Sequence, residues 1–486
     1  MSELLIRGGH IFDLKRSETA DILVRDGKIA AIGNGLSTQG TTVEARGKIV
    51  MPGFVNAHTH SNQALEKGLC DRYPLDAWMV IASYGGTNAE LSPRDLYVSA
   101  MIGAIEMIRT GSTSVLDMPR VNPASFAADS DAIMQAYADI GIRAAVAVSY
   151  SDVNFPASLP LDLVPGTEDT LKPRRTAAVA DLIGHLDAFI DRWKGRHPLL
   201  SPMIGPSSLP RCSTEMFEAS VDLARRRGVG LQTHLLSGKS QVMVGEKRYV
   251  GSTVDFLKRI GCLEDWATFA HSIWLSDEEV QTLGASQAVA VHNPVSNMKL
   301  GAGIAPIPEL RKAGGRIALG SDGASSADSQ NMFETIKGAA ILHRINHEQE
   351  DWILAEDALD MCWNGGAAAL RQKIGQLAVG HAADIVLLHT QNMFDAPRDQ
   401  LAGQIVHSEL GGSVDTVVVA GEIVLQNGKI TRIDEAAIHA EAQEIVSRLH
   451  AGLPERMRRA AQFQPLFREL ERRVSKTELN FSRFCG

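Results

Sequence analysis

The sequence has few cysteines and no long apolar run. Its cysteines are odd in number, lie far apart and form no C-x-x-C pair: Cys70, Cys212, Cys262, Cys362 and Cys485. This spacing argues against a thiolate zinc site and favours reduced, mostly buried thiols. No apolar segment approaches the roughly 20 residues that a membrane-spanning helix needs. We therefore expect no membrane span.

An excess of positive charge is also absent. The formal net charge is −9, the sequence pI is about 5.9, and the chain contains no Lys/Arg block. Nucleic-acid binding usually needs a basic face, so we expect no nucleic-acid partner. The first residues, 1–7, read as the start of a strand rather than as a signal peptide, which predicts a cytoplasmic location.

Both ends of the chain are rich in short strand patterns. The chain has 486 residues, of which 44% are hydrophobic, enough for one large core and a smaller second unit. Near the N-terminus, apolar and polar residues alternate over 4–12, 20–25 and 28–32, with a hairpin turn at Asp26-Gly27. Similar strand patterns occur near the other end, over 383–388, 416–420 and 422–426. These two ends predict one small β-sandwich domain.

The long middle of the chain alternates strand and helix patterns. Eight apolar strand candidates cover 54–58, 112–117, 144–149, 200–205, 229–234, 267–271, 288–292 and 317–321. Helical patterns between them include 96–109, 177–193, 213–227, 277–283 and 332–343. The alternation predicts an α/β protein with a (β/α)₈ TIM barrel, and an open doubly wound sheet is the alternative. The predicted domains are 1–52 and 376–430 for the sandwich, 53–375 for the catalytic barrel, and 431–486 for a helical tail, solvated or packed on another subunit.

Five residues at predicted strand ends have the chemistry of one metal site: His58, His60, His234, His271 and Asp322. Imidazole nitrogens and a carboxylate suit a borderline divalent ion, which can generate hydroxide from water near neutral pH. Residues two apart on a strand share a face, so the H-x-H pair can point into a barrel. The five lie at the ends of the first, fifth, sixth and eighth strands. Only a closed barrel brings those ends around one axis, which disfavours the open sheet.

The motifs around these residues resemble the amidohydrolase superfamily over nearly the whole chain up to about residue 430. Within it they resemble the branch of adenosylhomocysteine and methylthioadenosine deaminases, guanine deaminase and triazine chlorohydrolases. The motifs are Pro52-Gly53-Phe54-Val55-Asn56-Ala57-His58-Thr59-His60, Thr233-His234-Leu235, Ala270-His271, His292-Asn293-Pro294-Val295-Ser296-Asn297-Met298-Lys299-Leu300 and Gly320-Ser321-Asp322-Gly323-Ala324.

The resemblance implies roles for individual residues. One Zn²⁺, with Fe²⁺ as the alternative, would be held by His58, His60, His234 and Asp322. Asp322 would also take the proton from the attacking water, and His271 would contact that water or the developing oxyanion. Dinuclear members of the superfamily use a lysine on the fourth strand, and residues 200–205 contain none. One metal ion is therefore expected, and relatives of this kind are often homodimers or larger.

One position departs from the deaminase pattern. Deaminases of this branch carry a glutamate three residues after the fifth-strand histidine, where this chain has Ser237. An amine leaves only when it is protonated, and a hydroxyl is a poor proton carrier. Either another acid, such as Glu246, Glu66 or His271, moves the proton, or the leaving group departs as an anion.

The sequence thus predicts a mononuclear metal-dependent hydrolase that displaces an exocyclic amine, or a readily leaving halide or thiol, from an N-heterocycle. A cyclic amide hydrolase of the same superfamily and a non-catalytic barrel scaffold are the alternatives. Arg120, Lys239 and Arg248 are candidates for binding a substrate carboxylate, and Lys239 is favoured because it follows the fifth strand closely. The predicted substrate-binding residues are Ser237, Lys239, His292, Asn297 and Trp78.

Overall fold

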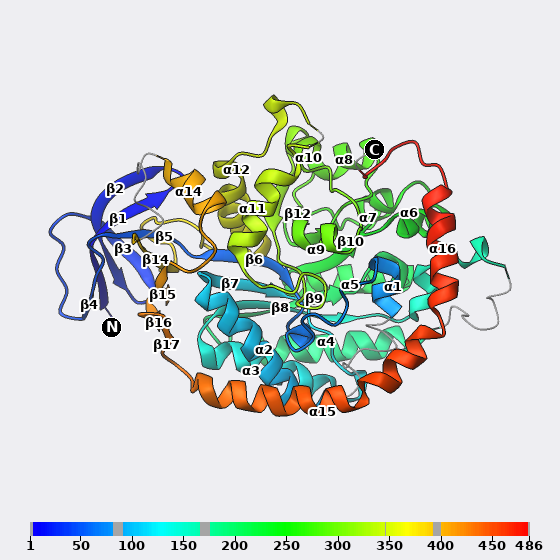
Figure 1. Ribbon diagram of the computed structural model, residues 1–486, viewed down its shortest axis with the longest axis horizontal. Coiled ribbons are helices and arrows are strands. Elements are labelled where there is room, and N and C mark those ends of the chain that lie inside the picture. Colours follow the sequence, from blue (N-terminus) through cyan, green and yellow to red (C-terminus); the bar gives the residue numbers. More distant parts are fainter. Residues whose placement is uncertain (1–2, 81–90, 166–174, 346, 392–399, 485–486) are drawn as a thin grey trace.

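Eight parallel strands form the central sheet of the protein (Figure 1). The computed structural model describes residues 3–80, 91–165, 175–345, 347–391 and 400–484. Spatial order follows chain order through β6 (Phe54–Thr59), β7 (Ser112–Asp117), β8 (Arg143–Tyr150), β9 (Leu200–Pro206), β10 (Leu231–Leu235), β11 (Ala267–His271), β12 (Val289–His292) and β13 (Arg316–Leu319). Each predicted barrel strand overlaps one of these.

The first and last strands of this sheet are joined by polar contacts at their ends. The main-chain N–H of Asp322 donates to the carbonyl of His58 at 2.9 Å. The main-chain N–H of Ser321 donates to Oδ1 of Asn56 at 3.0 Å, and Asn56 Nδ2 donates to Ser321 Oγ at 2.7 Å. These contacts bring β6 beside β13 and nearly close the sheet into the predicted barrel. The carboxyl ends of all eight strands therefore surround one axis, where barrel enzymes carry their active sites.

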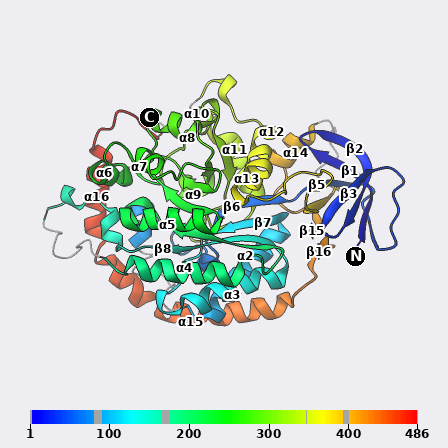
Figure 2. The same cartoon turned by 180° about the vertical axis from the view of Figure 1, so that it is seen from behind.

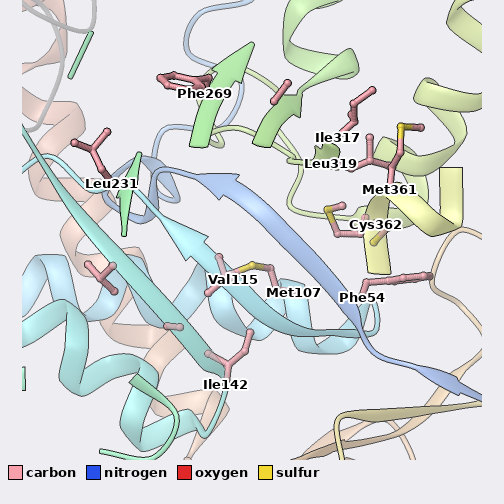
Figure 3. Close-up of a cluster of buried hydrophobic side chains, with 14 of the residues drawn as sticks. Phe54, Met107, Val115, Ile142, Leu231, Phe269, Ile317, Leu319, Met361 and Cys362 are labelled. Atoms are coloured by element: carbon pink, nitrogen blue, oxygen red, sulfur yellow. The ribbon is translucent and has the colours of Figure 1, made fainter. Parts of the chain in front are cut away.

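Burial on both faces explains why these segments form parallel strands. Every residue of β6, β7 and β11 is buried. Near-continuous apolar runs are typical of parallel strands that are covered on both sides. Figure 3 shows part of this core, where Phe54 of β6 lies among side chains that include Met107 of α2 (Pro93–Arg109) and Leu319 of β13. Phe54 also makes an edge-on contact with Phe333, with ring centroids 4.7 Å apart.

Helices surround the barrel (Figures 1 and 2). The side chains of Ser92, Ser213 and Ser276 cap three of them by accepting main-chain N–H bonds. Gly228 ends the helix that Ser213 caps, and Gly141 ends a fourth, both in the left-handed conformation. The helices that follow or flank the barrel strands are α1 (Leu75–Val80), α2 (Pro93–Arg109), α3 (Phe126–Ile140), α4 (Val179–Trp193), α5 (Thr214–Arg227), α6 (Lys239–Arg248), α7 (Thr253–Arg259), α8 (Asp277–Gly284), α9 (Pro294–Lys299), α10 (Ile307–Lys312), α11 (Met332–Leu342), α12 (Ala355–Asp360) and α13 (Gly366–Leu370).

The strands at the two ends of the chain form a second sheet, at one side of the barrel in Figure 1. Its strands are β1 (Glu3–Asp13), β2 (Arg16–Arg25), β3 (Lys28–Gly33), β4 (Thr41–Glu44), β5 (Lys48–Pro52), β14 (Ile385–His389), β15 (Val414–Val419), β16 (Glu422–Gln426) and β17 (Lys429–Ile430). β5 pairs antiparallel with β14, which joins the two ends. Fully buried residues from both ends, including Ile6, Ile22, Ile385 and Val418, share one core. The predicted association of the two ends is confirmed.

Two long helices complete the chain, after α14 (Leu401–His407). α15 (Glu435–Ala461) runs along α2, where Glu441 binds Arg94. α16 (Gln464–Lys476) then rises beside α1 and α6, as the red helix in Figure 1. Its residues Phe467 and Leu470 are buried against the barrel loops. The tail thus packs on its own barrel, and among the described residues no helix has the length and apolar character to cross a membrane.

Candidate metal centre and active site

The five residues predicted from the sequence converge at the carboxyl ends of the barrel strands. His58 lies in β6, His60 directly follows it, His234 lies in β10, His271 ends β11, and Asp322 follows β13. Nε2 of His60 lies 3.3 Å from Nε2 of His234 and 3.4 Å from Oδ1 of Asp322. Nε2 of His58 lies 3.7 Å from the same oxygen. Two overlapping sets bring their donor atoms within 4.8 Å of one another: His58, His60 and His234, and His58, His271 and Asp322.

Each histidine ring is held through its other nitrogen by an oxygen atom. Nδ1 of His58 contacts Oε1 of Gln232 at 2.8 Å, and Nδ1 of His271 contacts Oδ1 of Asn297 at 2.9 Å. The Nδ1 atoms of His60 and His234 contact the carbonyls of Met118 and Ser207 at 2.7 and 2.5 Å. Because an oxygen acceptor requires the proton on Nδ1, every Nε2 keeps its lone pair for the centre of the cluster.

The cluster fits a borderline divalent ion. Nε2 of His58 is buried and has no hydrogen-bond partner, which is costly unless something else binds it. Burial, with a smaller contribution from nearby His60, lowers the pKa of His58 to about 3, and burial also lowers the pKa of His234 and His271, so the rings are neutral. Metal ligation needs neutral imidazole. Bonds of about 2.0–2.1 Å in a tetrahedron place donor atoms about 3.4 Å apart, close to the spacings seen here.

The backbone is strained at the two residues expected to act on the attacking water. His271 has a φ of 72° and Asp322 a φ of 64°, in the left-handed region that few non-glycine residues adopt, although Asp and His do so more often than most. The strain is offset by contacts such as the Gly323 N–H, which donates to Asp322 Oδ1 at 2.7 Å. Burial opposes ionisation of Asp322, but at acidic pH, where the surrounding histidines become charged, they hold the pKa of its carboxyl below the ordinary value, with His271 contributing most. Strain of this kind is typical of active sites.

A cavity opens above the cluster, and two of the predicted substrate-binding residues line it. Ser237 and Trp78 are on its wall, and the indole N–H of Trp78 donates to the Ser325 carbonyl at 3.2 Å. The wall of this cavity also includes His60, Asn62, Asp76, Arg120, Ser149, Arg211, His234, His271 and Asp322. Polar groups therefore face the cavity from several strand ends and from α1.

The structure places the other three predicted substrate-binding residues elsewhere. Nζ of Lys239 donates to the Ser475 carbonyl of α16 at 3.2 Å and lies 5.8 Å from the Trp274 ring. The ammonium of Lys239 is therefore already bound by the C-terminal tail. His292 is fully buried, and its ring is 5.3 Å from that of His343. Among the described residues, neither Lys239 nor His292 lines the cavity. Asn297 holds His271 from behind and so positions a site residue rather than substrate.

Two of the acids proposed to replace the missing glutamate, Glu246 and Glu66, do not line this cavity. Glu246 lines a different cavity, and Glu66 is a buried residue that is not part of the wall of this one. Asp76 of α1, which the sequence analysis overlooked, lines the cavity and accepts a bond from Ser240 Oγ at 3.2 Å. Burial raises the pKa of Asp76 to about 6. Among the lining residues, Asp76 and Asp322 supply the carboxyl groups.

Gln232 is a second residue that sequence reasoning missed. Besides holding His58, its Nε2 donates to the Ala57 carbonyl at 2.9 Å and to Thr268 Oγ1 at 3.1 Å. It is fully buried in β10, two residues before His234. The period of two along a strand would have placed it on the same face as that histidine.

A barrel whose strand ends gather four imidazoles and a carboxylate around one point has the architecture of a metal-dependent barrel hydrolase. The chain belongs to the amidohydrolase family, whose model matches residues 49–424. The predicted superfamily resemblance is thereby confirmed.

Curated relatives and solved structures agree with this placement. The chain is 30% identical over 448 residues to 5'-deoxyadenosine deaminase of Methanothermobacter thermautotrophicus, covering 92% of this chain and 98% of that protein. It is 29% identical over 463 residues to 5-methylthioadenosine/S-adenosylhomocysteine deaminase of Pelotomaculum thermopropionicum, covering 92% and 99%. A crystal structure of atrazine chlorohydrolase from Arthrobacter aurescens TC1 complexed with zinc matches with a TM-score of 0.82 and 26% identity, covering 91% of this chain and all of that one.

Proposed function

We propose that this protein is an aminohydrolase with one metal ion, which removes an exocyclic amine from a nitrogen heterocycle by hydrolysis. The observation that carries the proposal is the convergence of the Nε2 atoms of His58, His60 and His234 with the carboxylate of Asp322 at a cavity. The relatives named as deaminases support an amine as leaving group. The zinc complex of a structural relative supports Zn²⁺, with Fe²⁺ as the alternative for such donors.

The residues divide the chemistry among them. His58, His60, His234 and Asp322 would hold the ion, which when bound supplies a hydroxide nucleophile near neutral pH. Asp322 accepts the proton that the attacking water loses. Because Asn297 keeps a proton on Nδ1 of His271, the Nε2 of His271 accepts a hydrogen bond from the same water.

Departure of the amine requires a proton, and Asp76 is the carboxyl group that can provide it. A new C–O bond forms at the ring carbon, the C–N bond breaks, and ammonia leaves with a proton from Asp76. Solvent returns a proton to Asp76 and takes the one held by Asp322, so the step balances. A pKa of about 6 leaves a useful fraction of Asp76 protonated near neutral pH.

Loss of a halide or thiolate is the second candidate reaction, and Ser237 favours it. Ser237 stands where the deaminase pattern has glutamate, and its buried Oγ has no hydrogen-bond partner. An anionic leaving group needs no strong acid. The crystal structure of an atrazine chlorohydrolase shows that this chemistry occurs on a related barrel.

A combined metal and substrate assay tests the proposal. Elemental analysis should find one zinc ion per chain, and a His234→Ala variant should lose it. Amino-, chloro- and thio-substituted purines, pterins, pyrimidines and triazines are then screened by ultraviolet change and by the released ion, with ammonia expected. A metal content below about 0.2 ions per chain, measured after growth with added metal, would support the scaffold instead. Chloride or sulfide release without ammonia would favour the second candidate.

A further inference from the structure

Arg120 is anchored at the edge of the cavity by its main chain. It lies three residues after the end of β7, and its N–H donates to Asn62 Oδ1 at 3.0 Å. It also forms a parallel bridge with Ser149 of β8, whose N–H donates to the Pro119 carbonyl at 2.8 Å. The Cα position of Arg120 is therefore set by two barrel strands and the turn after β6. The side chain lines the cavity that contains the metal cluster.

The guanidinium of Arg120 has no hydrogen bond and no ion pair within 4.0 Å to any residue that the structure describes. Two less exposed guanidiniums, by contrast, bind protein oxygens. Arg143 binds Asp384 at 2.8 and 3.1 Å, and Arg248 donates to the carbonyls of Leu209 and Pro210 at 3.0 and 2.9 Å. The Arg120 side chain is exposed at the cavity, and the protein atoms around it lower the pKa of its guanidinium, an effect that the charge of Glu66 opposes. A guanidinium that lines a cavity and has no protein partner is free to bind a carboxylate or phosphate through its paired N–H donors.

The charges on the cavity wall leave a positive excess for a ligand. Arg120 and Arg211 contribute guanidiniums, and Asp76 and Asp322 contribute carboxyl groups. The two carboxyl groups at most balance the two guanidiniums, so a divalent ion held at the histidine cluster would make the occupied cavity positive. Such a field attracts anions and disfavours cations.

We propose that the substrate carries an anionic group, a carboxylate or a phosphate, and that Arg120 binds this group through its guanidinium while the ring lies over the metal cluster. This inference rests on the proposed function for the identity of the reacting ring. Arg120 thereby determines substrate class and has no part in bond cleavage. It takes the role that the sequence pattern had favoured for Lys239, whose ammonium is held by the tail.

Matched substrates and one substitution test the role of Arg120. The zinc-loaded protein is given 6-aminopurine nucleosides that bear hydrogen, carboxylate or phosphate at the 5′ position. We expect kcat/KM to be higher for at least one anionic form, and Arg120→Met to lower it about 10- to 100-fold, the usual value of a hydrogen bond to a charged group. The neutral form should change less than about threefold. Whether carboxylate or phosphate loses more identifies the natural group.

Controls separate this inference from the proposed reaction. Arg72→Gln, at an exposed arginine in the segment after β6, should change nothing. Zinc content of Arg120→Met should equal that of the parent protein. Calorimetric binding of the deaminated anionic compounds needs no turnover, so its loss in Arg120→Met would support the inference even if deamination fails. Equal kcat/KM and equal binding of neutral and anionic compounds by the parent and Arg120→Met would overturn it.

Discussion

The side-chain oxygen of Asn297 lies 2.9 Å from Nδ1 of His271. The two residues come from α9 and β11, which the barrel brings together. This contact sets the tautomer of His271 and leaves Nε2 facing the cavity, 3.9 Å from Oδ2 of Asp322. The reactivity of His271 therefore depends on a residue that does not line the cavity.

Replacing Asn297 should impair catalysis more than metal binding. Asn297→Ala removes the acceptor at Nδ1, so His271 can turn or change tautomer, and kcat should fall about 10- to 100-fold. Asn297→Asp keeps an oxygen at that position and should retain more activity. Steady-state kinetics and zinc content are measured together. Loss of zinc in step with activity would show that His271 acts as a ligand instead.

Gln232 should control the affinity for the metal ion. Its Oε1 accepts from Nδ1 of His58, and a partner of this type is typically worth about 10- to 100-fold in metal affinity. Gln232→Leu should therefore release zinc to a chelator at correspondingly lower concentrations. Gln232→Glu, which preserves an acceptor, is the matched control. Unchanged zinc affinity in the leucine variant would mean that the ring of His58 is oriented by packing alone.

Asp322 should be indispensable for turnover. Asp322→Asn cannot accept the proton of the attacking water, and we expect kcat to fall about 1000-fold or more, within the range for loss of a general base. Asparagine tolerates a positive φ, so the fold should survive the change. Circular dichroism and thermal unfolding check this point. Retained activity on the native substrate would contradict the assigned role.

The leaving-group proton should come from Asp76. Because Asp76 is a donor only when it is protonated, kcat/KM for an amino substrate should fall as the pH rises above about 6. Asp76→Asn should remove this decline and lower the rate at pH 6. A chloro-substituted analogue of the same ring needs no donor and serves as the comparison. An identical loss for both analogues would show that Asp76 only positions substrate.

Ser237 should matter much less than a metal ligand. Ser237→Ala removes a hydroxyl that has no hydrogen-bond partner, so a loss of less than about tenfold is expected. His234→Ala, three residues earlier, should abolish zinc binding and activity. The two variants are compared by elemental analysis and kcat/KM. If Ser237→Ala is as damaging as His234→Ala, the hydroxyl takes a direct part in the reaction.

The metal cluster was predictable because each of its residues has a metal-ligating side chain and lies at the end of an apolar strand pattern. His58 and His60 are two apart at the end of an apolar strand, and His234, His271 and Asp322 each close another strand. Strand periodicity and the geometry of a parallel barrel are enough to bring such positions together. Gln232 follows the same rule, because it lies two residues before His234 on the same strand.

The substrate side of the cavity was not predictable in the same way. Lys239 is close to His234 in sequence, but its ammonium donates a hydrogen bond to Ser475 in α16, near the other end of the chain. Arg120 and Asp76 are ordinary charged residues in the sequence, and their importance comes from facing one cavity without a strong partner. Side-chain direction in loops depends on which distant segments pack there.

By itself the sequence determined the barrel, the joined β-rich ends and the donor atoms of the metal cluster, because these follow from short periodic patterns and from residue chemistry. Tertiary structure alone decided which charges face the substrate, which acid can serve the leaving group and which oxygen fixes each imidazole. Those outcomes depend on contacts between different segments of the chain, from 26 residues apart for His271 with Asn297 to 236 for Lys239 with Ser475.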